Sequence, residues 1–139
     1  MNLQLAFSGF NGTKITSLDL RANHLCNIDD AKLQLAFSEF KETNITSLNL
    51  GMNNLNLKNP HLIFSGLKET KITSVYLNND KGIERRKLDF SYFKGTKVSF
   101  VDLSKNELHS KSGNQLQSDF SSFKETNVTF VDLSDNALG

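Results

Sequence analysis

The chain has 139 residues, a formal net charge of +1 and an apolar fraction of 37%, so it is long enough for one domain. A charge so close to zero argues against a nucleic-acid partner and against binding to an anionic membrane surface. No apolar run approaches the roughly 18 residues that a membrane-spanning helix needs. The amino terminus has no basic start, so we expect no cleaved secretory signal, and the single Cys26 excludes an internal disulfide and fits the reducing cytoplasm.

In chain order, the first recurring segment reads LQLAFSGFNGT at 3–13, and versions of it return four times. Three of the five copies place apolar residues at i, i+4 and i+7, which is the spacing of one helix face. Two mostly phenylalanine columns recur in it: Phe7, Phe37, Phe64, Phe90 and Phe120, and Phe10, Phe40, Leu67, Phe93 and Phe123. We expect a helix in each unit, with these side chains in the core.

The second recurring segment follows each copy of the first and begins as ITSLDLRANHL at Ile15–Leu25. Its apolar residues alternate with polar or aromatic residues, as in a strand with one buried face. Such a unit is too small to close a core alone, so neighbouring units must stack. Further copies are ITSLNLGMNNL, ITSVYLNNDKG, VSFVDLSKNEL and VTFVDLSDNAL. We expect one domain of five helix–strand units, at approximately 1–28, 29–57, 58–82, 83–111 and 112–139.

Local residue choices indicate where several helices begin. Favourable amino-terminal residues are Asp29 or Asp30, Asn59 followed by Pro60, and Ser112 or Asn114. The fourth unit is different, because its helix would begin near the basic run of 82–87, and cations oppose the dipole at the amino end of a helix. We therefore expect the fourth helix to be short or distorted.

The second segment matches the pattern L-x-x-L-x-L-x-x-N-x-L and resembles the leucine-rich repeat family, in its ribonuclease-inhibitor-like class. This resemblance implies an α/β solenoid in the form of a curved horseshoe fragment, with a parallel sheet on the concave face and helices on the convex face. The sequence pattern T-x-I-T-S-L-x-L, which follows F-x-x-F, also resembles leucine-rich repeat effectors of intracellular bacterial pathogens. That resemblance implies secretion by a bacterium into the host cytosol.

Two polar columns have structural roles. An asparagine amide both donates and accepts, so the asparagine column can satisfy backbone groups where the chain leaves the sheet. Its members are Asn23, Asn53, Asn106 and Asn136. Asp80 replaces asparagine in the third unit and can only accept when ionised, and Gly82 replaces the last leucine there. The threonine column, which we expect to close turns, is Thr13, Thr43, Thr70, Thr96 and Thr126.

The outward residues of the strands differ between units and form the candidate binding surface. Adjacent strands lie about 4.8 Å apart, so Phe100 and Phe130 should touch, with Tyr76 on a diagonal. We expect these aromatics to anchor a protein partner within a polar rim. The candidate residues are Tyr76, Phe100, Asp102, Phe130, Asp132 and Ser134, with Asp135 nearby. The alternative is that the rings only stabilise each other as a cross-strand pair.

No nucleophile–base pair and no phosphate-binding glycine loop occurs in the sequence. The three histidines, His24, His61 and His109, lack metal-ligand spacing. We therefore expect a non-catalytic protein-interaction module with no cofactor and no metal.

Two alternatives concern the end of the chain at Gly139, where no capping helix follows the fifth strand. A bare edge strand at Val131–Leu133 invites pairing, which predicts a self-associating module that forms a homodimer through the carboxy-terminal edge. The other alternative is a fragment of a larger multidomain enzyme or effector.

Overall fold

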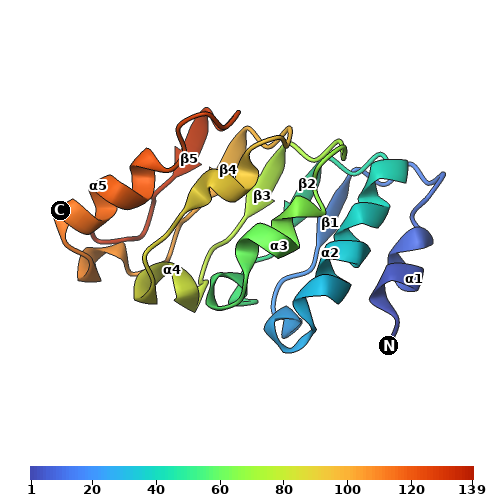
Figure 1. The fold of residues 1–139 in the computed structure, drawn as a ribbon, viewed down its shortest axis with the longest axis horizontal. Helices are drawn as coiled ribbons and strands as arrows, with labels where there is room; N and C mark the ends of the chain where they lie inside the picture. The colour runs from blue at the N-terminus through green and yellow to red at the C-terminus, as the bar shows by residue number, and fades with distance from the viewer.

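In a computed structural model that describes residues 1–139, five parallel strands form one sheet in chain order. The strands are β1 Ser17–Asp19, β2 Ser47–Asn49, β3 Ser74–Tyr76, β4 Phe100–Asp102 and β5 Phe130–Asp132. Equivalent positions of successive units are register partners, from Ser17 beside Ser47 to Phe100 beside Phe130. The repeat alignment therefore gives the register, and Figure 1 shows the helices as a second layer along one face of the sheet.

Helices occur in all units but are short. The α-helices are α1 Leu3–Ser8, α2 Asp30–Ser38, α3 Pro60–Ser65, α4 Lys81–Arg85 and α5 Gly113–Ser121. The 3-10 turns are η1 Leu25–Asn27, η2 Glu39–Glu42, η3 Leu55–Leu57, η4 Phe90–Phe93 and η5 Leu108–Ser110. Asp29, Asn59 and Ser112 accept hydrogen bonds from the first turns of α2, α3 and α5, so one expected cap is confirmed for each helix.

The fourth unit departs from the others, as expected, but for a different reason. Its phenylalanine segment forms the 3-10 turn η4, and α4 takes the place that a 3-10 turn has in other units. Asp80 caps α4 by accepting from the Gly82 nitrogen at 3.0 Å. Arg85 and Arg86 lie at the carboxyl end of α4, where the helix dipole favours cations, so the expected opposition to the dipole was wrong. A side chain at Gly82 is excluded, because its Cβ would lie 2.2 Å from the carbonyl carbon of Asn56.

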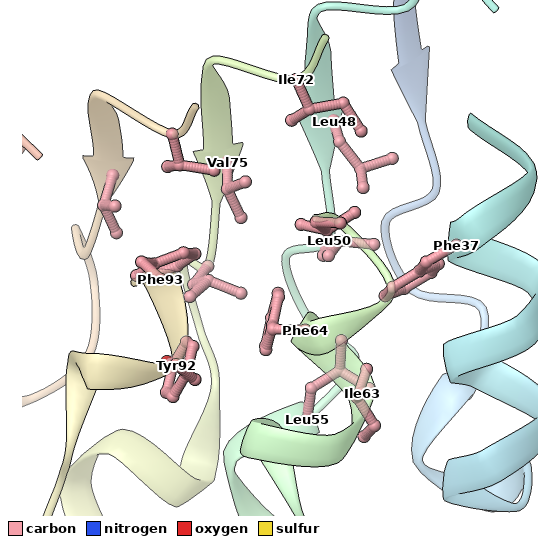
Figure 2. Close-up of a cluster of buried hydrophobic side chains, with 14 of the residues drawn as sticks. Phe37, Leu48, Leu50, Leu55, Ile63, Phe64, Ile72, Val75, Tyr92 and Phe93 are labelled. Carbon is pink, nitrogen blue, oxygen red and sulfur yellow. The ribbon is translucent and has the colours of Figure 1, made fainter. Parts of the chain in front are cut away.

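The core lies between the sheet and the helices (Figure 2). Phe37, Phe64 and Phe93 have no exposed surface, and the rings of Phe64 and Phe93 lie 5.5 Å apart. The phenylalanine columns are therefore core in units two to four, as predicted. In the fifth unit Phe120 and Phe123 are only partly buried.

The asparagine column forms a hydrogen-bonded ladder along the sheet edge. Asn53 accepts from the backbone nitrogens of Asn23 and Leu25 at 2.9 and 3.1 Å, and its amide donates to the carbonyls of Leu20 and Leu50. Asn136 repeats this pattern, whereas Asn106 donates to two carbonyls but accepts from one backbone nitrogen only, that of Asp80. Asp80 makes no donation to a carbonyl and instead accepts from both nitrogens of Asn56. The predicted loss of the donor at this unit is thus confirmed.

The threonine column closes the turn before each strand. Thr96, for example, donates to the Phe93 carbonyl at 2.7 Å and accepts from the Val98 nitrogen at 3.3 Å. The same pair of bonds occurs at Thr13, Thr43, Thr70 and Thr126. The turn-closing role predicted from the sequence is confirmed.

Candidate protein-binding face

The sheet face opposite the helices, which we call the open face, corresponds to the concave face expected from the repeat pattern. Phe100 and Phe130 are register partners on it, with ring centroids 5.1 Å apart and planes tilted by 32°. Tyr76 is the register partner of Asp102, and its ring centroid lies 5.4 Å from that of Phe100. The predicted contact between the three rings is confirmed, and we call Tyr76, Phe100 and Phe130 the aromatic ridge.

The aromatic ridge is open to solvent. The Phe130 side chain is 59% exposed, and Tyr76 and Phe100 are partly exposed. The Tyr76 hydroxyl makes no hydrogen bond within the chain, unlike the buried hydroxyl of Tyr92, which donates to Asn56. The ridge thus combines apolar ring faces with one free polar group.

Asp102 and Asp132, which we call the aspartate pair, have a structural role that the sequence analysis missed. One oxygen of each accepts from the backbone nitrogen two residues later, Asp102 from Ser104 at 2.7 Å and Asp132 from Ser134 at 2.9 Å. The backbone hydrogen bond from Ser134 lowers the pKa of Asp132, so this carboxylate is charged at neutral pH. The Ser134 side chain lowers the pKa of Asp132 further, and neither aspartate belongs to an ion pair.

Ser134 does not lie on a strand, contrary to the expectation that the outward alternation continues that far. β5 ends at Asp132, and the hydrogen bond from the Ser134 nitrogen turns the chain away from the sheet. Ser134 is exposed, and its carbonyl accepts from the Lys105 nitrogen at 3.2 Å. It therefore lies at the rim of the open face.

The amino-terminal half of the open face is small and polar. Asp19 binds the guanidinium of Arg21 through both carboxylate oxygens, with an Nη2–Oδ2 distance of 3.0 Å. Both side chains are about half exposed, and the hydrogen bonds from Arg21 lower the pKa of Asp19. The early outward position holds Ser17 and Ser47 there, so no aromatic side chain lies in this half.

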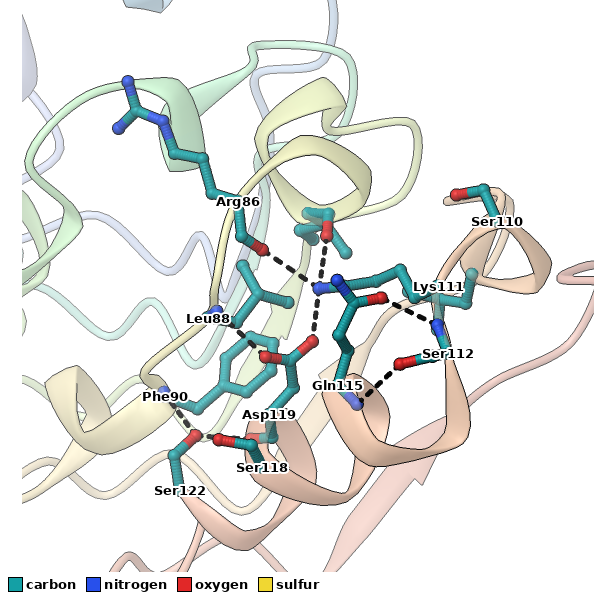
Figure 3. A network of polar contacts seen from close by, with 12 residues as sticks. Arg86, Leu88, Phe90, Ser110, Lys111, Ser112, Gln115, Ser118, Asp119 and Ser122 are labelled. Atoms are coloured by element: carbon teal, nitrogen blue, oxygen red, sulfur yellow. Dashed lines mark hydrogen bonds and ion pairs between the residues drawn. The ribbon is translucent and has the colours of Figure 1, made fainter.

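A buried ion pair between Lys111 and Asp119, on the helix side of the sheet, was not predicted from the sequence (Figure 3). Lys111 donates to Asp119 and to the carbonyls of Ile83 and Arg86 at 3.1 and 3.0 Å, and Asp119 accepts from the Leu88 nitrogen at 3.0 Å. The two side chains are 5% and 1% exposed. These bonds connect α5 and the turn before it to α4 and to the segment that follows α4. Asp119 occupies the position that holds alanine in unit two and isoleucine in unit three, but unit four has Asp89 there, which is exposed and accepts from the Ser91 nitrogen instead.

The other buried polar cluster joins units two, three and four. The Tyr92 hydroxyl donates to Asn56 Oδ1 at 3.0 Å, and Asn56 donates to Asp80. Burial raises the pKa of Asp80 and raises the pKa of Tyr92 well above its ordinary value. Each group has a partner, so we interpret the cluster as part of the scaffold.

No group of three or more His, Cys, Asp and Glu side chains is arranged to hold a metal ion. No helix is both long and apolar enough to cross a membrane.

The comparisons with known proteins agree with this architecture. The leucine-rich repeat-containing protein LegL7 from Legionella pneumophila matches with a TM-score of 0.76 and 26% sequence identity, over 98% of this chain. The fold is a leucine-rich repeat solenoid. The match supports the resemblance to leucine-rich repeat proteins of bacteria. The chain spans 43% of the length of that structure. No family model and no curated protein matches the chain.

Proposed function

We propose that this chain is a non-catalytic module that binds a protein partner through the carboxy-terminal half of its open face. The observation that carries the proposal is the exposed aromatic ridge, in which Phe130 is 59% exposed beside Phe100. Binding hot spots are rich in aromatic side chains that are surrounded by a polar rim. Asp102, Asp132 and Ser134 supply that rim.

The scaffold supports this use of the ridge. Parallel strands with a regular register hold the three rings at fixed spacing, so little conformational entropy is lost when a partner covers them. The side chains of the core columns and of the asparagine ladder make contacts inside the fold, whereas the outward residues vary between units. Outward residues that vary over a repeated core are what a repeat scaffold with a specific binding surface requires.

We further propose that the module acts as a bacterial effector in the cytosol of a host cell. The support is the repeat phrasing and the structural similarity to a leucine-rich repeat protein from Legionella pneumophila. Expression with a secretion reporter in a bacterium that carries a host-directed secretion system tests this role. Translocation of the reporter into host cells supports it, and retention in the bacterium contradicts it.

The binding proposal is tested by affinity capture from host lysate, followed by quantitative mass spectrometry. The informative variant combines Phe100→Ser with Phe130→Ser, because serine occupies this position in β1 to β3 and is compatible with the strand. The matched control combines Ser17→Ala with Ser47→Ala in the other half of the open face. We expect proteins captured by the wild type and by the control to be lost with the double serine variant.

Unchanged capture by the double serine variant would contradict the proposal. A folding defect is excluded by circular dichroism and urea unfolding of each variant. The variant removes two ring contacts, Phe100 with Phe130 and Phe100 with Tyr76, at about 0.5–1.5 kcal/mol each, which a folded repeat domain should tolerate.

Self-association through β5 stays a prediction. β5 pairs only with β4, but β1 likewise pairs only with β2, and Ile15 at that other flank is 41% exposed. Light scattering after gel filtration tests it: a dimer disrupted by Val131→Lys supports pairing at β5, and a monomer at high concentration contradicts it.

A further inference from the structure

We propose that the partner segment taken by the open face carries an arginine, whose guanidinium binds between the aspartate pair and the aromatic ridge. This inference rests on the proposed function and deepens it, since it states the chemistry of the partner at the same face.

The carboxy-terminal half of the open face has uncompensated negative charge. Asp102 and Asp132 are direct register partners on adjacent parallel strands, which lie about 4.8 Å apart. Like charges directly opposite each other destabilise a sheet. None of the five ion pairs of the chain involves either aspartate, and Lys105 in the following turn pairs with neither. A cation from a partner would relieve this repulsion.

The first unit shows which cation this column accepts. Asp19 occupies the same column as the aspartate pair and binds the guanidinium of Arg21 through both of its oxygens. In the fourth and fifth units the position of Arg21 is taken by Ser104 and Ser134, which supply no cation. The aspartate pair beside the aromatic ridge therefore lacks the guanidinium partner that Asp19 has.

The geometry favours arginine over lysine and over a metal ion. A guanidinium is planar, presents several donors in a fixed fork and stacks on aromatic rings, whereas an ammonium is a compact and strongly hydrated point charge. The carboxylates of Asp102 and Asp132, which have no cation within the chain, can accept from that fork, while the ring of Tyr76 or Phe100 lies against its face. A calcium ion needs about six to eight oxygen ligands, and only two carboxylates are present here.

The test begins with selection of a displayed random dodecapeptide library on the wild-type protein, with counter-selection on the double serine variant. The selected peptides are then synthesised with each arginine replaced by lysine or by glutamine. Affinities are measured by fluorescence anisotropy at about 0.1 M and about 1 M salt, because the Debye length falls from about 10 Å to about 3 Å over that range. Calcium chloride alone serves as the competing metal probe.

The decisive variant combines Asp102→Asn with Asp132→Asn. Asparagine keeps the turn, since Asn49 accepts from the Gly51 nitrogen at 3.0 Å in the second unit just as the aspartates do in theirs. The variant thus removes charge and leaves the backbone bond. We expect peptides enriched in arginine, a loss of roughly tenfold or more in affinity with this variant or with glutamine, and a weaker salt dependence in both cases.

The outcomes separate the inference from the proposed function. Selected peptides that require the aromatic ridge but show no arginine preference, or that bind the asparagine variant equally well, would overturn the inference and leave the binding face standing. Competition by calcium at millimolar concentration would also overturn it. Failure to select any peptide that distinguishes the wild type from the double serine variant would overturn the proposed function itself, and the inference with it.

Discussion

The two halves of the solenoid are built from the same repeat, yet they differ on both faces of the sheet. The amino-terminal half has a small polar open face, an internally neutralised Asp19 and regular ladder asparagines. The carboxy-terminal half combines the aromatic ridge and the aspartate pair with the irregular α4 and the buried Lys111–Asp119 pair. The half that presents the aromatic ridge and the aspartate pair is thus also the half whose scaffold contains the additional buried ion pair.

The largest expected difference between the halves concerns two equivalent lysines. Lys111 and Lys58 occupy the same repeat position, and each donates to the carbonyl of an isoleucine one repeat earlier in the chain, Ile83 and Ile28. Lys58 also pairs with Asp30, but those side chains are 25% and 26% exposed, against 5% and 1% for Lys111 and Asp119. Lys111→Met should lower the free energy of unfolding by about 3–5 kcal/mol, because it leaves a buried carboxylate unpaired. Lys58→Met should cost less than Lys111→Met, because the Lys58–Asp30 pair is more open to water.

Urea unfolding followed by circular dichroism measures both effects. The double variant Lys111→Met with Asp119→Leu should recover most of the lost stability, since it removes both buried charges. Equal costs for the two lysine variants would show that the halves do not differ in this respect.

A smaller difference is expected between two threonines of the same column. Thr96 is 2% exposed and Thr13 is partly exposed, although each hydroxyl makes the same two bonds. Thr96→Val should cost about 1–3 kcal/mol, because the Phe93 carbonyl and the Val98 nitrogen lose their partner away from water. Thr13→Val should cost less, since water can replace the hydroxyl. Thermal or urea unfolding of the pair decides this, and a larger cost at Thr13 would contradict the burial argument.

The smallest expected effect is the pH dependence due to Asp80, at the boundary between the halves. Burial raises the pKa of Asp80, so the folded protein holds this proton to a higher pH than the unfolded chain does. Its contribution to stability is therefore most favourable below the ordinary aspartate pKa of about 3.9 and is lost as pH rises toward the raised value. Asp80→Asn removes this contribution.

Urea unfolding of the wild type and of Asp80→Asn across this pH range checks the sign. As pH rises, the free energy of unfolding of Asp80→Asn should increase relative to that of the wild type. Other acidic groups contribute equally to both proteins, so their effect cancels in this difference. A difference in free energy of unfolding that does not change with pH would refute the role of Asp80.

The repeat pattern was enough to predict the register, the core columns, the ladder and the contact of Phe100 with Phe130. These features depend on positions that recur, so each copy supports the others. The Lys111–Asp119 pair and the Tyr92–Asn56–Asp80 cluster occur once, and they depend on packing between units. Asp119 replaces the apolar residue of the first three units, but the exposed Asp89 does so too in the fourth unit, so the residue type alone could not reveal the buried pair. The carboxyl ends of the strands were also missed, because alternation in the sequence continues past the turn that Asp132 closes.

The central claim is that only one half of the open face binds the partner, and amide hydrogen exchange of the free and partner-bound chain tests it most directly. The probe is the captured protein or the selected peptide with highest affinity. Binding should protect the segments around β4 and β5, at residues 98–104 and 128–134, and leave those around β1 and β2 unchanged. Protection confined to β1 and β2, or to the helices on the other face, would contradict the account.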